Sequence, residues 1–133
     1  MTRRALVDAA KAARAQAYAP YSNYHVGAAL FCEDGSIICG CNVENASYGL
    51  TICAERNAIF AGVGQGRRNF VAMAIIGDGT RPAIPCGACL QVMSEFAPEL
   101  TLYIGAAETD DIIETTVQAL LPARFTLAKE EER

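Results

Sequence analysis

The sequence of 133 residues has no tryptophan, one histidine and no long apolar segment. No run of apolar residues approaches the roughly 20 that a helix needs to cross a bilayer. Residues 1–18 include two early arginines, but polar residues interrupt the alanines that follow, so the stretch lacks the apolar centre of a signal peptide. We therefore expect a cytoplasmic protein that does not associate with membranes.

Positive charge is also scarce. The chain has 11 Lys and Arg against 15 Asp and Glu, and its formal net charge is −4. The only basic doublets, Arg3-Arg4 and Arg67-Arg68, are too few to form the charged footprint that binds DNA or RNA. We expect no nucleic-acid partner.

The length suits one domain, residues 1–133, and an apolar content of 52% supports a core without disulfides. Apolar periodicity and turn residues predict alternating elements. In chain order these are a helix over 2–18, strands over 25–32 and 36–43, a helix over 53–62, a strand over 70–77, a helix over 85–97, a strand over 100–105, a short helix within 115–125 that Pro122 stops, and a solvated tail over 129–133. The pair Asp34-Gly35 predicts a hairpin between the first two strands. The order indicates a layered α/β domain with a mixed sheet.

Six cysteines in a cytoplasmic chain indicate metal ligands, catalytic thiols or small core residues. Cys86 and Cys89 form a C-x-x-C at a predicted helix start. A thioredoxin-type redox pair should follow the first strand, and this pair comes late. A structural zinc site needs four protein ligands, and Cys39 and Cys41, the available partners, lie in an apolar strand pattern. With Cys53 as the third ligand, zinc would keep the open fourth position that catalysis requires.

Cys53 has two interpretations, a small core residue or a metal ligand. Its place at a helix start, with Glu55 beside it, favours the ligand, because a helix N-terminus stabilises a thiolate. The remaining cysteines, Cys32, Cys39 and Cys41, lie on predicted strands, and we assign them to the core. The single histidine, His25, has no spaced partner, and a structural or solvent-facing role is expected.

Glu55 is either an acidic residue favoured by the helix dipole or a general acid/base beside a metal-bound water. The combination of C-x-E with P-C-x-x-C decides for the second, because it is the signature of zinc-dependent nucleobase deaminases.

The chain resembles the small, homotetrameric cytidine deaminases with three cysteine ligands. The resemblance covers nearly the full length and rests on four stretches in order: PYSNYHVGAAL (20–30), GCNVENASYGLTICAERNAI (40–59), PCGACLQV (85–92) and LLPARF (120–125). It implies a three-layer α/β/α sandwich with a central mixed sheet. The implied reaction is hydrolysis of cytidine and 2'-deoxycytidine to uridine and 2'-deoxyuridine with release of ammonia, as in pyrimidine salvage.

The resemblance also implies site roles. One Zn²⁺ per subunit would be bound by Cys53, Cys86 and Cys89, and Glu55 would transfer protons. The substrate contacts would come from Asn42 and Glu44 to ribose, the backbone of Ala54 to the pyrimidine, Tyr24 near the nucleoside, and Phe125 from a neighbouring subunit of the homotetramer. Tyr48 is a further candidate for a contact between subunits.

Three thiolates on Zn²⁺ leave a local charge of −1, which should make a bound water less acidic. Arg56 follows Cys53 by three positions, about one helical turn, so its guanidinium could donate to the thiolates rather than point into solvent. The sequence departs from the family at Leu90, where many members have arginine, and at Tyr24, where phenylalanine is usual. The first departure leaves more of the charge compensation to Arg56.

Two other functions remain open. One is a deaminase of a modified or N4-substituted cytosine nucleoside or of a blasticidin-type antibiotic, although the NVENASYG segment favours a ribose ligand. The other is a non-catalytic zinc-binding interaction module, which would bind zinc and have no need of Glu55.

Overall fold

The structure, a computed structural model, describes residues 1–127, so the predicted tail lies outside the described residues. Its elements follow the chain in the order α1 (Arg3–Arg14), β1 (Val26–Cys32), β2 (Ile37–Cys41), a short 3₁₀ turn (Tyr48–Leu50), α2 (Ala54–Gly64), β3 (Phe70–Gly77), α3 (Gly87–Phe96), β4 (Thr101–Ala106), β5 (Ile113–Thr116) and α4 (Val117–Leu120). Thr2 caps α1 by accepting a hydrogen bond from the Ala5 N–H.

One mixed sheet runs through the molecule in the strand order β2-β1-β3-β4-β5. The β3–β4 pair is parallel, because α3 carries the chain back across the sheet, and the other three pairs are antiparallel. The Asp34-Gly35 hairpin forms as predicted, and Gly35 adopts a φ of 91° there. The parallel pair brings the ends of β3 and β4 to the same edge of the sheet.

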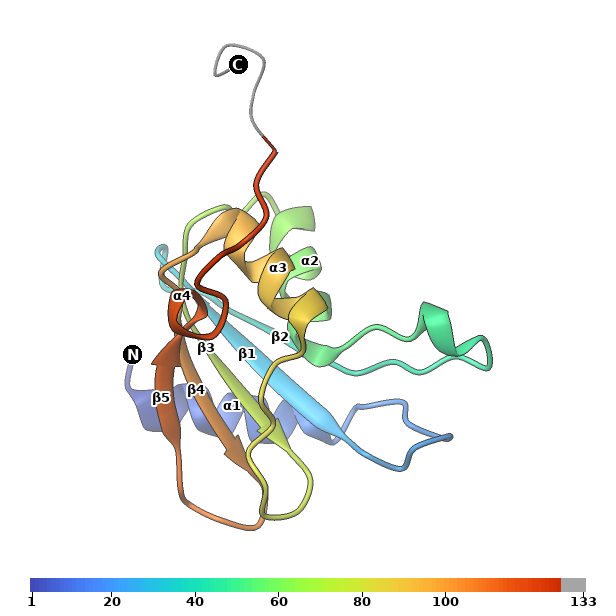
Figure 1. The fold of residues 1–133 in the computed structure, drawn as a ribbon. Coiled ribbons are helices and arrows are strands. Elements are labelled where there is room, and N and C mark those ends of the chain that lie inside the picture. The colour runs from blue at the N-terminus through green and yellow to red at the C-terminus, as the bar shows by residue number, and fades with distance from the viewer. Residues whose placement is uncertain (128–133) are drawn as a thin grey trace.

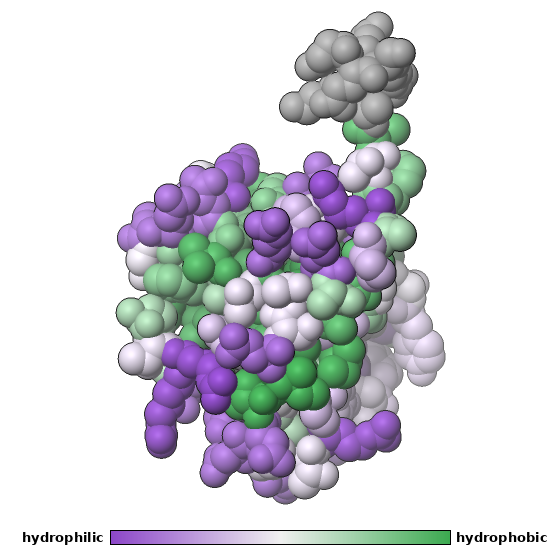
Figure 2. All heavy atoms as spheres, turned by 60° about the vertical axis from the view of Figure 1, so that its left-hand side comes forward, coloured by the Kyte–Doolittle hydropathy of each residue, from purple (hydrophilic) through white to green (hydrophobic). Residues whose placement is uncertain are grey.

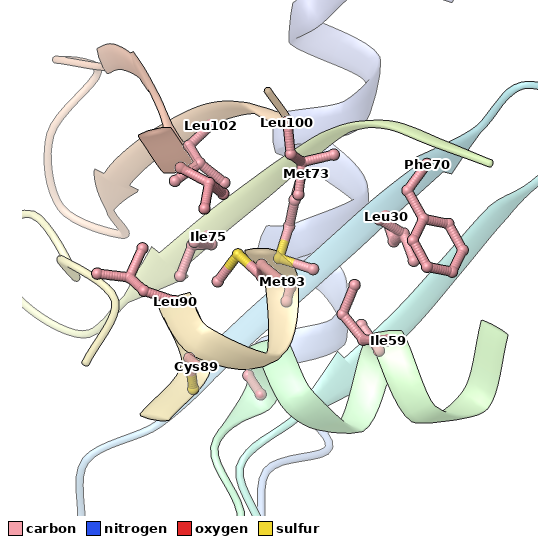
Figure 3. Packing of buried hydrophobic residues seen from close by; sticks show 14 of the residues in the cluster. Leu30, Ile59, Phe70, Met73, Ile75, Cys89, Leu90, Met93, Leu100 and Leu102 are labelled. Atoms are coloured by element: carbon pink, nitrogen blue, oxygen red, sulfur yellow. The ribbon is translucent and has the colours of Figure 1, made fainter. Parts of the chain in front are cut away.

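Helices cover both faces of this sheet, with α1 on one side and α2 and α3 on the other (Figure 1). Each face has its own buried cluster: the smaller contains Leu6, Val7 and Ile76, and the larger joins strand residues to α2 and α3. In the larger cluster Met73 of β3 and Met93 of α3 lie together, and Cys89 lies at the start of α3 (Figure 3). The predicted three-layer α/β/α sandwich with a central mixed sheet is therefore confirmed.

The backbone of α2 lies directly on β2. A β-carbon at Gly40 would come within 2.5 Å of the Ala58 nitrogen and 2.6 Å of the Ala54 carbonyl oxygen, so only glycine permits this approach. Asn57 adds a hydrogen bond of 2.8 Å from its side-chain amide to the carbonyl of Cys41. These contacts fix the first turn of α2, and with it Cys53, relative to the sheet.

Two sequence predictions are wrong in part, one about a helix and one about the burial of the cysteines. The short helix predicted from Thr115 and stopped by Pro122 begins later, because Thr115 and Thr116 belong to the edge strand β5 and only Val117–Leu120 is helical. The assignment of three cysteines to the core holds for Cys32, which is buried, but Cys39 is exposed and Cys41 is half-buried. The reason is that β2 is an edge strand, so neighbouring layers cover it incompletely.

Of the described residues, no helix is both long and apolar enough to cross a membrane. On the face shown in Figure 2, apolar side chains form an area bordered by polar ones. Several large apolar side chains are more than half exposed, among them Tyr48, Leu50 and Phe125.

Candidate active site

Two helix N-termini meet at the candidate site. Cys53 is the N-cap residue of α2 and Cys86 is the N-cap residue of α3, while Cys89 lies in the first turn of α3. Neither N-cap cysteine makes a side-chain capping hydrogen bond. The first backbone N–H groups of a helix have no partner within the helix and carry a partial positive charge, which favours thiolates at this place.

The three sulfurs form one cluster. The Cys53 and Cys86 sulfurs are 4.0 Å apart, and all three Sγ atoms lie within 4.8 Å of one another. A tetrahedral zinc with bonds of about 2.3 Å to sulfur requires sulfurs about 3.8 Å apart, so the cluster fits such an ion with a small contraction. Because the described residues place no fourth Cys, His, Asp or Glu ligand in this group, a metal bound there would keep one position open.

Arg56 lies beside the cluster, on the side facing Cys53. Its Nη2 donates to the Cys53 sulfur over 3.5 Å, in the arrangement expected from the spacing in the sequence. The neighbouring Cys89 thiol and the guanidinium of Arg56 lower the pKa of Cys53 to about 5. The proximity of Cys53 raises the pKa of Cys89, and burial acts in the same direction. The cluster therefore carries negative charge beside a fixed cation.

Leu90, the residue that departs from the family, does not face this charge. Its side chain is buried in the larger apolar cluster, where it lies near Ile75 (Figure 3). Leu90 therefore packs in the core of this chain, and Arg56 is the cation that contacts the sulfur of Cys53.

The carboxyl group of Glu55 is 5% exposed and lies beside the cysteines. Burial raises its pKa to about 7, and the negative charge on Cys53 acts in the same direction. A carboxyl group with this pKa accepts and releases protons readily near neutral pH, as a general acid/base must.

A cavity of about 810 Å³ opens over Cys53, Glu55 and Cys86. This volume lies within the range of about 300–1,000 Å³ typical of small-molecule sites. Asn42 and Glu44 line the same cavity, as their alternate positions after β2 predicted. The site residues of two distant sequence motifs therefore share one cleft.

The side chains of Asn42 and Glu44 both form hydrogen bonds with other parts of the chain. The Asn42 side chain accepts from the Val26 N–H and donates to the Tyr24 carbonyl, each over 2.8 Å. The Glu44 carboxylate accepts from the N–H groups of Tyr21 and Ser22 and from the Ser22 hydroxyl. These hydrogen bonds orient the two side chains at the edge of the cavity and leave further lone pairs on the Glu44 carboxylate.

Of the other predicted substrate residues, some line the cavity and one does not. Tyr24 and Ala54 line the cavity, and Ala54 is the first residue of α2. Phe125 does not line it: the Phe125 backbone exchanges hydrogen bonds with the Gln91 side chain, and the residue is 68% exposed. Tyr48 is also exposed and packs edge-on against Tyr21, with ring centroids 5.9 Å apart.

Sequence reasoning missed the loop that follows β3. Asp78 and Arg81 of this loop line the cavity, and Asp78 accepts hydrogen bonds of 2.8 Å from the backbone and the ring Nδ1 of His25. His25 therefore has the structural role that was expected of it. The signal available was position: loops at the carboxyl ends of strands build sites in α/β domains, and this loop leads into Cys86.

Comparisons with known proteins agree with this arrangement. The family model described as the cytidine and deoxycytidylate deaminase zinc-binding region matches residues 1–104. Cytidine deaminase from Halalkalibacterium halodurans is 54% identical over 95% of this chain and 96% of its own length. Cytidine deaminase from Sporosarcina psychrophila is 49% identical over 91% of this chain and 89% of its own length.

A solved structure gives the same result in three dimensions. The 1.6 Å crystal structure of cytidine deaminase from Burkholderia pseudomallei superposes with a TM-score of 0.91 at 51% identity, covering 94% of this chain and all of that one. The site geometry and the matching sequences lead to one conclusion: the chain belongs to the family of cytidine and deoxycytidylate deaminases.

Proposed function

We propose that this protein hydrolyses cytidine and 2'-deoxycytidine to the corresponding uridines and ammonia, a reaction of pyrimidine salvage. The observation that carries the proposal is a single cavity lined by two cysteines of the three-sulfur cluster, by a buried Glu55 with a pKa of about 7, and by the polar pair Asn42 and Glu44. Membership in the deaminase family supports the reaction type.

In this proposal Cys53, Cys86 and Cys89 hold one Zn²⁺ per chain. Zinc, when bound, would supply a water of lowered pKa to the substrate. The chain's contribution is to keep three sulfurs converged at two helix starts, and to place Arg56 where its charge offsets theirs.

Glu55 is the proposed general acid/base. It takes a proton from the attacking water as the water oxygen bonds to C4, and gives that proton to N3 of the pyrimidine. It then transfers the second proton of the added oxygen to the exocyclic nitrogen. The C4–N bond breaks, ammonia leaves and uridine remains, so atoms and charges balance. The burial that raises the pKa of Glu55 suits it to both directions of transfer.

Substrate contacts come from the walls of the cavity. Asn42 and Glu44 form hydrogen bonds with adjacent ribose hydroxyls, and the Glu44 carboxylate accepts in these bonds. The Ala54 backbone contacts the pyrimidine, and the Tyr24 ring packs near the nucleoside. The support for these roles is that all four line the same cavity as Glu55.

We also propose a cytoplasmic homotetramer. Six free thiols fit a reducing compartment. Exposed aromatic and aliphatic side chains, among them Tyr48 and Phe125, fit subunit contacts, and Phe125 would complete the site of a neighbouring subunit.

The first prediction concerns Glu55. Purified wild type loaded with zinc should convert cytidine to uridine and ammonia, and Glu55→Gln should lose at least about 100-fold in kcat because an amide cannot accept the proton. Uridine formation and zinc content are measured together, with Glu95→Gln, an exposed position on α3, as the matched control. A zinc-loaded wild type without turnover would indicate an interaction module instead.

The second prediction concerns Arg56. Removing its guanidinium leaves the thiolate charge uncompensated, so Arg56→Ala should lose zinc faster to a chelator, by about 10-fold or more. Zinc content after dialysis is the measurement, and Arg4→Ala, on the exposed side of α1, is the control. Equal zinc retention and an unchanged pH–rate profile in Arg56→Ala would rule out this role.

The third prediction concerns the ribose contacts. If Asn42 and Glu44 bind the sugar, kcat/KM for cytidine should exceed that for free cytosine by at least about 1,000-fold, because the smaller ligand leaves site groups unpaired. Glu44→Gln should reduce this preference, while Glu33→Gln in the exposed β1–β2 hairpin should keep it. Equal efficiency on the two substrates would refute the sugar contacts.

The fourth prediction concerns assembly. Sedimentation velocity should give a tetramer, and Phe125→Ala should raise KM although Phe125 does not line the cavity of its own chain. Full activity in a monomeric wild type is the result that would contradict the shared site.

A further inference from the structure

Gly77 and Tyr24 meet at the edge of the cavity. Gly77 is the buried last residue of β3, paired with Val26 on one side and Ala106 on the other. A β-carbon at Gly77 would overlap the Tyr24 hydroxyl oxygen and lie 3.0 Å from its Cζ. The phenol therefore occupies the space that a side chain at position 77 would fill.

The space beside Gly77 that the Tyr24 phenol occupies, here called the seat, lies on the side of the sheet that carries the cysteine cluster. Side chains alternate along a strand, so position 77 shares its face with Ile75, which belongs to the cluster containing Ala54 and Cys89. Ala83 also borders the seat, since its β-carbon would lie 3.0 Å from a β-carbon at Gly77. Both Tyr24 and Ala83 line the cavity, so the seat adjoins the substrate space.

Tyr24 is 40% exposed, and the contact described for its phenol end is with Gly77 and not a hydrogen bond. Within residues 1–127, the Tyr24 hydroxyl makes no hydrogen bond to another protein group, although the Tyr24 backbone is anchored through Asn42 and Ser22. Burial raises the pKa of Tyr24, and the carboxyl groups of Asp78 and Glu55 raise it further, so the phenol is neutral at ordinary pH. The absence of a side chain at Gly77 is what leaves room for this neutral ring.

We propose that Gly77 is a positioning residue for Tyr24 and that the pair determines how much of the cavity a nucleoside can enter. The inference rests on the proposed nucleoside deaminase function. A methyl group at position 77 displaces the phenol from its place, and we infer that the ring moves into the cavity, which Tyr24 already lines. The displaced ring then narrows the space beside Asn42 and Glu55 while leaving the cysteines and the proton-transferring carboxyl group in place.

The effects of substitutions at Gly77 and Tyr24 are coupled, because the main steric overlap involves the Tyr24 hydroxyl oxygen. The Tyr24→Phe substitution removes the oxygen that a β-carbon at position 77 would overlap, and the milder contacts of 3.0 Å at Cζ and at the Ala83 β-carbon remain. The Gly77→Ala substitution should therefore be better tolerated in the Tyr24→Phe background than in the wild-type background. This difference is specific to the seat, and a general weakening of the fold would not produce it.

The test is a double-mutant cycle with wild type, Gly77→Ala, Tyr24→Phe and the double variant, all loaded with zinc. Gly77→Ala should raise KM for cytidine by about 10-fold with kcat within about 3-fold of wild type, because binding space and not chemistry is affected. Adding Tyr24→Phe should return KM to within about 3-fold of the Tyr24→Phe variant alone. Gly64→Ala, at a glycine with open space around it, is the matched control and should change neither constant.

Two results would overturn the proposal: an unchanged KM in Gly77→Ala, or a double variant as impaired as Gly77→Ala. Thermal unfolding of the four proteins tests the seat without reference to activity. Gly77→Ala should lower the Tm more in the wild-type background than in the Tyr24→Phe background, and equal losses would contradict the steric coupling. If wild type itself does not act on cytidine, the proposed function fails, and the Tm cycle still decides whether Gly77 seats the ring.

Discussion

Negative charge at the cysteine cluster is the constraint on which the site depends. Like charges a few ångströms apart repel, and the cluster at Cys53, Cys86 and Cys89 is stable only where positive potential surrounds it. Two helix N-termini supply part of that potential and Arg56 supplies a full charge. The need for two helix starts at one point explains why α2 and α3 lie side by side on the same face of the sheet (Figure 1).

The substrate space follows from the same arrangement. Because α2 starts directly after the segment that follows β2, and α3 starts after the loop that follows β3, the two connections must form opposite walls above the sulfurs. Asn42 and Glu44 come with the first connection, and Asp78 and Arg81 come with the second. The internal hydrogen bonds of Asn42 and Glu44 stiffen the first wall, and those of Asp78 to His25 tie the second wall to the segment that precedes β1.

Much of this organisation could be predicted from the sequence. Long apolar patterns predicted α1 to α3 and the first four strands, and the C-x-E and C-x-x-C spacings predicted which side chains converge. Strand β5 was missed because Ile113–Thr116 is short, lies at an edge and contains Glu114 and two threonines, so it lacks an apolar pattern. The exposure of Cys39 depends on which layers cover an edge strand, and the contact of Tyr24 with Gly77 joins segments far apart in the chain. Both are tertiary properties that local pattern does not contain.

The contact of Gly40 with α2 bears on which ions the cluster can hold. Side-chain packing can adjust through rotamer changes, but a contact between two backbones cannot. The height of the Cys53 backbone above the sheet is thus set by main-chain geometry, so the contraction that a bound zinc requires must come from side-chain rotation at the cysteines. If the cluster binds a metal as proposed, a backbone frame that limits the sulfur spacing would discriminate among ions by size and geometry and not by affinity alone.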